Sequence, residues 1–148
     1  MKYLISIAMI IFCNLAMGQI FKSDKWCDVL LTEEVRRFAN NNFPPPPYKQ
    51  PIVYIQAVPL SPRFYATAEE LEKNVYIINV NIIYLDKVVG LERTLIHELQ
   101  HVIQFHSGRL KITQEGFIFD GECYEFSTPY GLRPWEVEAF MVTDIFCD

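Results

Sequence analysis

The stretch Leu91–His106, LERTLIHELQHVIQFH, decides how the rest of the chain is interpreted. Its apolar residues recur at spacings of three and four, which predicts an amphipathic helix with one face toward a core. The expected core-facing residues are Leu95, Leu99, Val102 and Ile103. Inside this predicted helix, the five residues from His97 to His101 read His-Glu-Leu-Gln-His, an HExxH motif.

The spacing of this motif suits a metal site. Residues four apart on a helix differ by about 40° in direction, so His97 and His101 leave the same face one turn apart. Two neutral imidazoles at that separation can occupy two corners of a tetrahedral zinc. Glu98 is rotated by about 100° from His97, which places it beside the metal. There it can act as general base toward a zinc-bound water.

A third protein ligand is required, and spacing removes some candidates. The metzincin pattern needs Gly at position 104 and His at position 107, where this chain has Gln104 and Ser107. His106 is five residues past His101, so it turns to the far side of the helix. The chain has three His in total. The third ligand must therefore be a carboxylate or, less often, a tyrosine or cysteine.

The segment Pro134-Trp135-Glu136-Val137-Glu138-Ala139 supplies carboxylates on a predicted helix. Together with HExxH, it resembles the gluzincin branch of zinc peptidases, in which a downstream helix donates Glu from an ExxA context. The resemblance implies Glu136 as third zinc ligand, with Glu138 as its rival. The two acids point to different faces of the helix, so both cannot bind one zinc.

The resemblance implies an α+β fold, a minimal zincin-like domain. It would contain a small twisted sheet, the HExxH helix and a C-terminal glutamate helix. The residue patterns predict the same mixture of helices and strands. Expected are helices over 24–41, 91–106 and 135–146, strands over 51–58 and 74–85, a short helix or polar loop over 67–73, a stiff connector at Pro44–Pro47, and a hairpin of 117–119 with 123–126 around Asp120-Gly121.

Supporting roles around the metal are also predicted. Gln104 lies near the zinc-facing stripe, where it would orient a ligand or line the cleft, although an ordinary surface Gln would look the same. Tyr130 and Arg133 precede the glutamate helix and are candidate donors to an oxyanion. Zincins commonly run an edge strand above the metal, and Tyr76–Tyr84 is the candidate for pairing there with an extended substrate.

The N-terminal residues predict export. Lys2, an apolar run from Leu4 to Cys13 and the small residues before Gln19 are typical of a signal peptide over 1–18. We therefore expect a single domain over 19–148, secreted or periplasmic, with no membrane association after cleavage. That domain would carry 12 Lys and Arg (13 less Lys2) against 18 Asp and Glu. An acidic chain with no basic cluster is a poor binder of nucleic acid.

Three cysteines follow the predicted signal peptide: Cys27, Cys123 and Cys147. In an oxidising compartment the simplest arrangement is one disulfide and one thiol. All three pairings remain open, with Cys27–Cys147 slightly favoured because it would join the two ends of the domain. Their spacing resembles no zinc knuckle, so we expect no cysteine metal ligand.

These features predict a secreted zinc metallopeptidase that holds one zinc per chain and hydrolyses a peptide or protein substrate. An alternative is a zincin-fold interaction module that binds zinc with weak or no turnover. An intact Glu98 disfavours that alternative, because a purely structural site needs no base and tends to have four protein ligands. A third class, a structural domain without metal, would require the motif to be coincidental. The oligomeric state is left open.

Overall fold

A computed structural model describes residues 21–24, 26–43, 49–86 and 88–147. The predicted signal peptide and the Pro44–Pro47 connector lie outside these residues. Helices and strands both contribute, so the α+β prediction is confirmed. Among the described residues, no helix combines the length and the apolar composition needed to cross a membrane.

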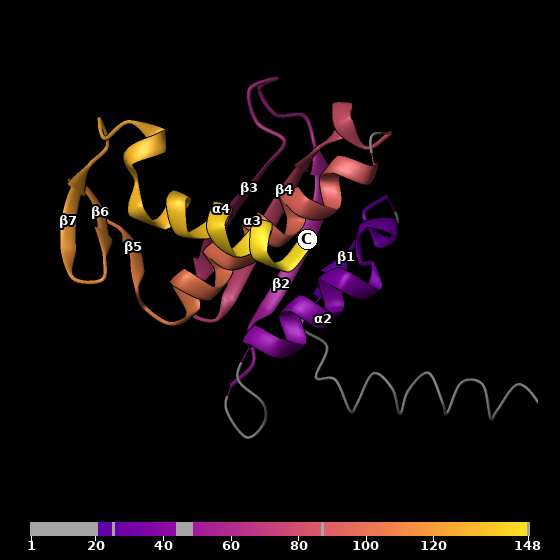
Figure 1. Cartoon of the computed structure of the whole chain (residues 1–148), viewed down its shortest axis with the longest axis horizontal. Helices are drawn as coiled ribbons and strands as arrows, with labels where there is room; N and C mark the ends of the chain where they lie inside the picture. Colours follow the sequence, from indigo (N-terminus) through magenta and orange to yellow (C-terminus); the bar gives the residue numbers. More distant parts are fainter. Residues whose placement is uncertain (1–20, 25, 44–48, 87, 148) are drawn as a thin grey trace, which may run out of the picture.

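The main sheet has four strands in the order β1-β2-β4-β3 (Figure 1). β1 pairs parallel with β2, and β2 pairs parallel with β4. β3 runs antiparallel to β4 and forms one edge of the sheet. The strands are β1 (Phe21–Ser23), β2 (Ile52–Val58), β3 (Ala66–Glu72) and β4 (Val75–Asn81).

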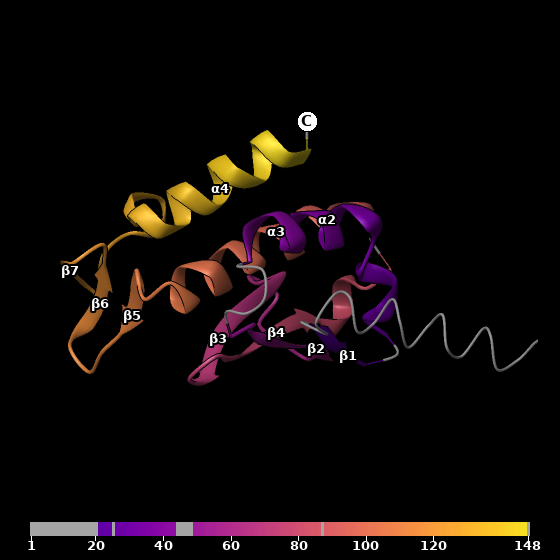
Figure 2. The ribbon, with the colours of Figure 1, turned by 90° about the horizontal axis from the view of Figure 1, so that it is seen from below.

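The helices lie on one side of this sheet. Figure 2 shows α2 (Glu33–Asn42) and α3 (Val88–His106) next to the strands, with α4 (Pro134–Cys147) on the outer side of α3. α3 is the predicted HExxH helix, and α4 is the predicted C-terminal glutamate helix. α3 is therefore held between the sheet and α4, which brings the HExxH motif close to both.

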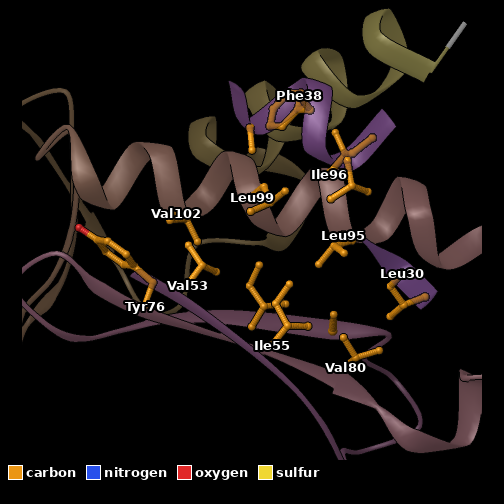
Figure 3. Close-up of a cluster of buried hydrophobic side chains, with 14 of the residues drawn as sticks. Leu30, Phe38, Val53, Ile55, Tyr76, Val80, Leu95, Ile96, Leu99 and Val102 are labelled. Atoms are coloured by element: carbon orange, nitrogen blue, oxygen red, sulfur yellow. The ribbon is translucent and has the colours of Figure 1, made fainter. Parts of the chain in front are cut away.

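Most of the core lies between the sheet and α3, and Figure 3 shows Ile96 together with Phe38 of α2 on the side of α3 away from the sheet. Alternate residues of β2 and β4 are buried, whereas Tyr54 and Gln56 on the other face of β2 are exposed. This alternation is that of a sheet covered on one face. The principal core residues are Val53, Ile55, Tyr76, Ile78 and Val80 from the strands, with Leu95, Ile96, Leu99 and Val102 from α3.

The first predicted helix begins later than expected. The prediction of a helix from Asp24 is wrong, because α2 starts at Glu33 with Thr32 as its N-cap. The Asp24 carboxylate accepts hydrogen bonds from the backbone of Cys27 and of Ala57. It thereby ties the preceding turn to β2, and the turn is followed by only a short 3₁₀ segment, Asp28–Leu30.

Residues 67–72 belong to strand β3, which corrects the prediction of a short helix or polar loop over 67–73. Asn74, at φ 67°, allows the tight reversal from β3 into β4. As a result β4 lies between β2 and β3. Tyr76–Tyr84 is therefore not an edge strand, and that prediction is wrong; the edge belongs to β3.

A second sheet of three antiparallel strands lies at one end of the molecule (Figure 1). The turn between its last two strands has Asp120 at φ 49° and Gly121 at φ 88°, the positive values of a type I′ turn. The predicted Asp-Gly hairpin is thus confirmed. The first strand of this sheet, Leu110–Ile112, was not predicted. The strands are β5 (Leu110–Ile112), β6 (Gly116–Phe119) and β7 (Glu122–Glu125).

The favoured Cys27–Cys147 disulfide does not form in the structure. Cys27 is fully buried in the core, Cys147 is half-buried against it, and Cys123 is exposed. Burial, followed by the nearby Asp24 carboxylate, raises the pKa of the Cys27 thiol to about 12. Cys27 therefore behaves as a core residue with little thiolate character at neutral pH.

Candidate metal centre

Three buried side chains from two helices converge where α3 and α4 pack together. His97 and His101 come from successive turns of α3, and Glu136 comes from the first turn of α4. Ala139 follows one turn later and is fully buried, so a small side chain lies where the two helices approach. The gluzincin resemblance implied that these two helices would lie together.

The three polar atoms form a nearly equilateral triangle. Nε2 of His101 lies 3.1 Å from Oε2 of Glu136 and 3.2 Å from Nε2 of His97, which is itself 3.2 Å from the same oxygen. Ligands at about 2.0–2.1 Å from a tetrahedral ion are separated from one another by about 3.3 Å. The triangle therefore has the size of one face of a tetrahedral site, and the group could hold a metal ion.

The electrostatics suit a cation. Burial alone would raise the pKa of Glu136, but hydrogen bonds from His101 and His97 outweigh it and hold that pKa well below its usual range. Burial lowers the pKa of His101, but the Glu136 hydrogen bond and the nearby Glu98 charge raise it overall. The site thus contains an anionic oxygen and two imidazole nitrogens. Each of the three residues is only 7–8% exposed.

Glu98 lies beside this group without belonging to it. Its carboxylate accepts a hydrogen bond from the backbone N–H of Ala68 in β3. Burial raises the pKa of Glu98, and the neighbouring histidines only partly oppose this rise. A carboxylate whose pKa is raised toward neutrality is a better proton acceptor than an ordinary surface glutamate.

A cavity of about 520 Å³ opens next to the group and reaches His97 and Glu98. Aromatic side chains line one part of it, and the charged Arg63, Arg93 and Asp144 line another. The Phe140 ring centroid lies 4.5 Å from that of His97, and the Tyr130 hydroxyl donates a hydrogen bond to Glu136. The aromatic side chains lining the cavity are Phe64, Tyr65, Tyr130 and Phe140.

The predicted site residues separate into two sets. The group contains His97, His101 and Glu136, and the rival Glu138 is turned away toward Arg109. Tyr130 and Gln104 contact the group directly. Arg133 does not contribute to it: its guanidinium donates to the backbone carbonyl of Thr128 and lies over the Phe117 ring.

Two residues of the site and its surroundings, Phe140 and Arg109, were not predicted from the sequence. Phe140 lies four residues after Glu136 on α4, so the helical repeat could have placed it on the same face. Arg109 precedes β5 and contacts Glu138, 29 positions away. A pairing over that distance depends on how the second sheet folds against α4, and no local pattern signals it.

One wall of the cavity is a loop whose backbone is hydrogen-bonded to a buried side chain. Asn81, at the end of β4, is fully buried. Its side-chain amide donates to the carbonyls of Leu60, Ser61 and Phe64. Asn81 therefore helps to fix the loop that carries Phe64 and Tyr65 into the cavity, together with the Tyr84 hydroxyl, which donates to the Pro62 carbonyl at 2.7 Å.

Replacing Asn81 with Leu is expected to lower the free energy of unfolding by about 2–4 kcal/mol, because several loop carbonyls lose their donor. Urea unfolding followed by circular dichroism measures the change. Asn79→Leu is the matched control, since Asn79 lies two residues earlier on β4 and contacts only the exposed Gln56 side chain in the described hydrogen bonds. Equal losses in the two variants would contradict this role.

No protein-family model, curated protein or solved structure matches the chain. The fold and the site therefore define only a class: an α+β domain with a buried group of two histidines and one glutamate that could hold a metal ion.

Proposed function

We propose that this protein is a zinc-dependent peptidase of the zincin type. The observation that carries the proposal is the placement of Glu98. It lies next to three convergent metal-ligating side chains, at the wall of an open cavity, and is not one of the three. A purely structural metal site closes with four protein ligands, whereas a catalytic one leaves a position open.

Zinc is the ion that suits this donor set best. Two imidazole nitrogens and one carboxylate oxygen form one of the ligand sets of catalytic zinc. His97, His101 and Glu136 would hold the ion. When bound, zinc supplies Lewis-acid chemistry: it lowers the pKa of a water and polarises a carbonyl.

The chain itself would supply the proton transfers. The buried Glu98 carboxylate, with its raised pKa, takes the proton of the attacking water and then returns it to the leaving amine. Tyr130 lies at the cavity wall, and its single O–H, which donates to Glu136 in the structure, would turn to a developing oxyanion when Glu136 holds the ion.

The proposed substrate is an extended peptide bound along β3. β3 is an edge strand, and its Ala68 N–H points toward Glu98. A peptide pairing with this edge by β-augmentation would pass directly beside the base. The aromatic cavity wall would receive an apolar side chain of that peptide.

Export also belongs to the proposal, and it rests on the sequence of residues 1–18. Mass spectrometry of protein recovered from the secreted or periplasmic fraction would test it. A mature N-terminus at Gln19 is expected.

Zinc content and peptide hydrolysis test the proposed activity together. We expect about one zinc per chain, and cleavage of an unfolded protein substrate detected as new N-termini by mass spectrometry. Cleavage should disappear with a chelator and return with added zinc. Absence of zinc uptake would contradict the metal centre, and uptake without cleavage would leave the zinc-binding interaction module as the function.

Replacing Tyr130 with Phe is expected to reduce kcat by about 10²-fold, because the oxyanion loses a donor. One zinc per chain should remain. Steady-state kinetics and metal analysis measure both quantities. Tyr124→Phe is the control, since Tyr124 lies in β7 of the second sheet and packs against Trp135 of α4. A wild-type kcat in Tyr130→Phe would remove this residue from the reaction.

A further inference from the structure

A chain of hydrogen bonds leads from His101 away from the cavity. Nδ1 of His101 lies 2.8 Å from Oε1 of Gln104, which is fully buried on the next turn of α3. Nε2 of Gln104 donates to the backbone carbonyl of Trp135 at 3.0 Å and to Oε1 of Glu138 at 3.1 Å. One amide group therefore joins the imidazole to two positions on α4.

These partners fix the proton on His101. A carbonyl and a carboxylate only accept hydrogen bonds, so the NH₂ of Gln104 must face Trp135 and Glu138. The amide oxygen is then left for His101 and accepts a hydrogen bond from Nδ1–H. With Nδ1–H held in this way, Nε2, the atom that faces Glu136, is the nitrogen that gives up its proton when His101 becomes neutral, and it can then present its lone pair to a metal.

Glu138 is the centre of this network. Besides Gln104, its carboxylate accepts from Gln100 at 2.8 Å and from Arg109 at 2.7 and 3.0 Å. The same guanidinium forms a bidentate pair with Asp120 at the β6–β7 turn, with both distances 2.7 Å. Glu138 is thus held from α3 on one side and from the second sheet on the other.

We propose that Gln104, Glu138 and Arg109 form a positioning relay that sets His101 in the tautomer needed to bind a metal. The relay rests on the proposed metal centre and extends it to the second sheet. Among the described residues, the buried Nδ1 of His97 has no hydrogen-bond partner, so this orientation acts on one imidazole of the pair. The relay also explains the position of Glu138, whose carboxylate orients a ligand of the proposed zinc through Gln104.

The direct test compares two glutamines of α3. Gln104→Leu removes the acceptor of His101, and zinc affinity measured by chelator competition should fall about 10–100-fold. The visible spectrum of the cobalt(II) form should shift, since it reports ligand geometry. Gln100→Leu is the matched control: it removes another donor to the same Glu138 carboxylate without touching His101. Its affinity should change by less than about threefold.

If Gln104→Leu folds poorly, a second variant, Glu138→Gln, still tests the relay. Glu138→Gln loses the ion pair with Arg109, and its zinc affinity should fall by about threefold to tenfold, because Glu138 acts on His101 only through Gln104. Thermal unfolding of each metal-free variant separates loss of affinity from loss of fold. Wild-type affinity and an unchanged cobalt spectrum in both variants would overturn the relay while the metal centre stands.

The tautomer can also be measured without metal. Long-range ¹H–¹⁵N spectra of the metal-free protein, at a pH where imidazoles are neutral, should show His101 protonated on Nδ1. Gln104→Leu should show a mixture of tautomers, and Gln100→Leu should match the wild type. A His101 protonated on Nε2 in the wild type would overturn the relay. Failure of the wild type to bind zinc, with the Nδ1–H tautomer present, would instead overturn the proposed function.

Discussion

Replacing Glu98 with Gln is expected to reduce peptide hydrolysis by about 10²–10⁴-fold while one zinc per chain remains bound. Gln has the same shape and can still accept the Ala68 N–H through its amide oxygen. It cannot take a proton from water at neutral pH. Because Glu98 is outside the group of His97, His101 and Glu136, its replacement should leave metal binding intact.

The measurement is kcat/KM on the best substrate found, with zinc content determined on the same preparation. Glu115→Gln is the control, since Glu115 is exposed in the second sheet's first turn and lies away from the cavity. Loss of activity together with loss of zinc would give Glu98 a role in holding the metal. Full activity without loss of zinc would remove it as the base.

The HExxH helix and the glutamate helix could both be predicted because their signals are local. The apolar spacing of α3 and the Pro134 start of α4 each lie within one element. The spacing of His97 and His101 alone places both imidazoles on one face, and the structure shows them 3.2 Å apart at Nε2. Short-range geometry of this kind needs no knowledge of the tertiary fold.

β3 could not be predicted in the same way. Its sequence, ATAEELE, has acids and Leu at positions that also suit a helix or a loop, and most of its side chains are exposed. It becomes a strand because β4 offers it a partner across the reversal at Asn74. Pairing with a neighbouring strand overrode local preference here. Because β3 pairs with β4, the segment predicted as an edge strand, Tyr76–Tyr84, begins in an interior strand of the sheet.

The choice between Glu136 and Glu138 also depended on distant residues. Both acids lie in the first turns of α4, and the helix allows either one to face α3. Arg109 and Gln100 decide the outcome, because they bind the Glu138 carboxylate and leave Glu136 for the histidines. Before the structure, only the resemblance favoured Glu136.

Replacing Glu136 with Gln is therefore expected to weaken zinc binding by more than the roughly 10–100-fold that partners outside the ligand set contribute. Its carboxylate is the anionic member of the group, and hydrogen bonds from His101 and His97 keep its pKa low. Gln at this position can still accept a hydrogen bond from an imidazole, so the metal-free fold should survive. The loss should therefore appear in the metal-bound state.

Thermal unfolding with and without zinc measures that difference. At free zinc of about 1,000 times the wild-type Kd, the wild type should gain about 4 kcal/mol of stability, and Glu136→Gln, with an affinity lowered more than about 100-fold, should gain less than about 1.5 kcal/mol at the same concentration. Glu138→Gln is the matched control from the same helix turn, and it should retain one zinc and most of the stabilisation. If Glu138→Gln loses the zinc-dependent stabilisation and Glu136→Gln keeps it, Glu138 is the ligand. In that case α4 must rotate on metal binding, since the Glu138 carboxylate faces Arg109 in the structure.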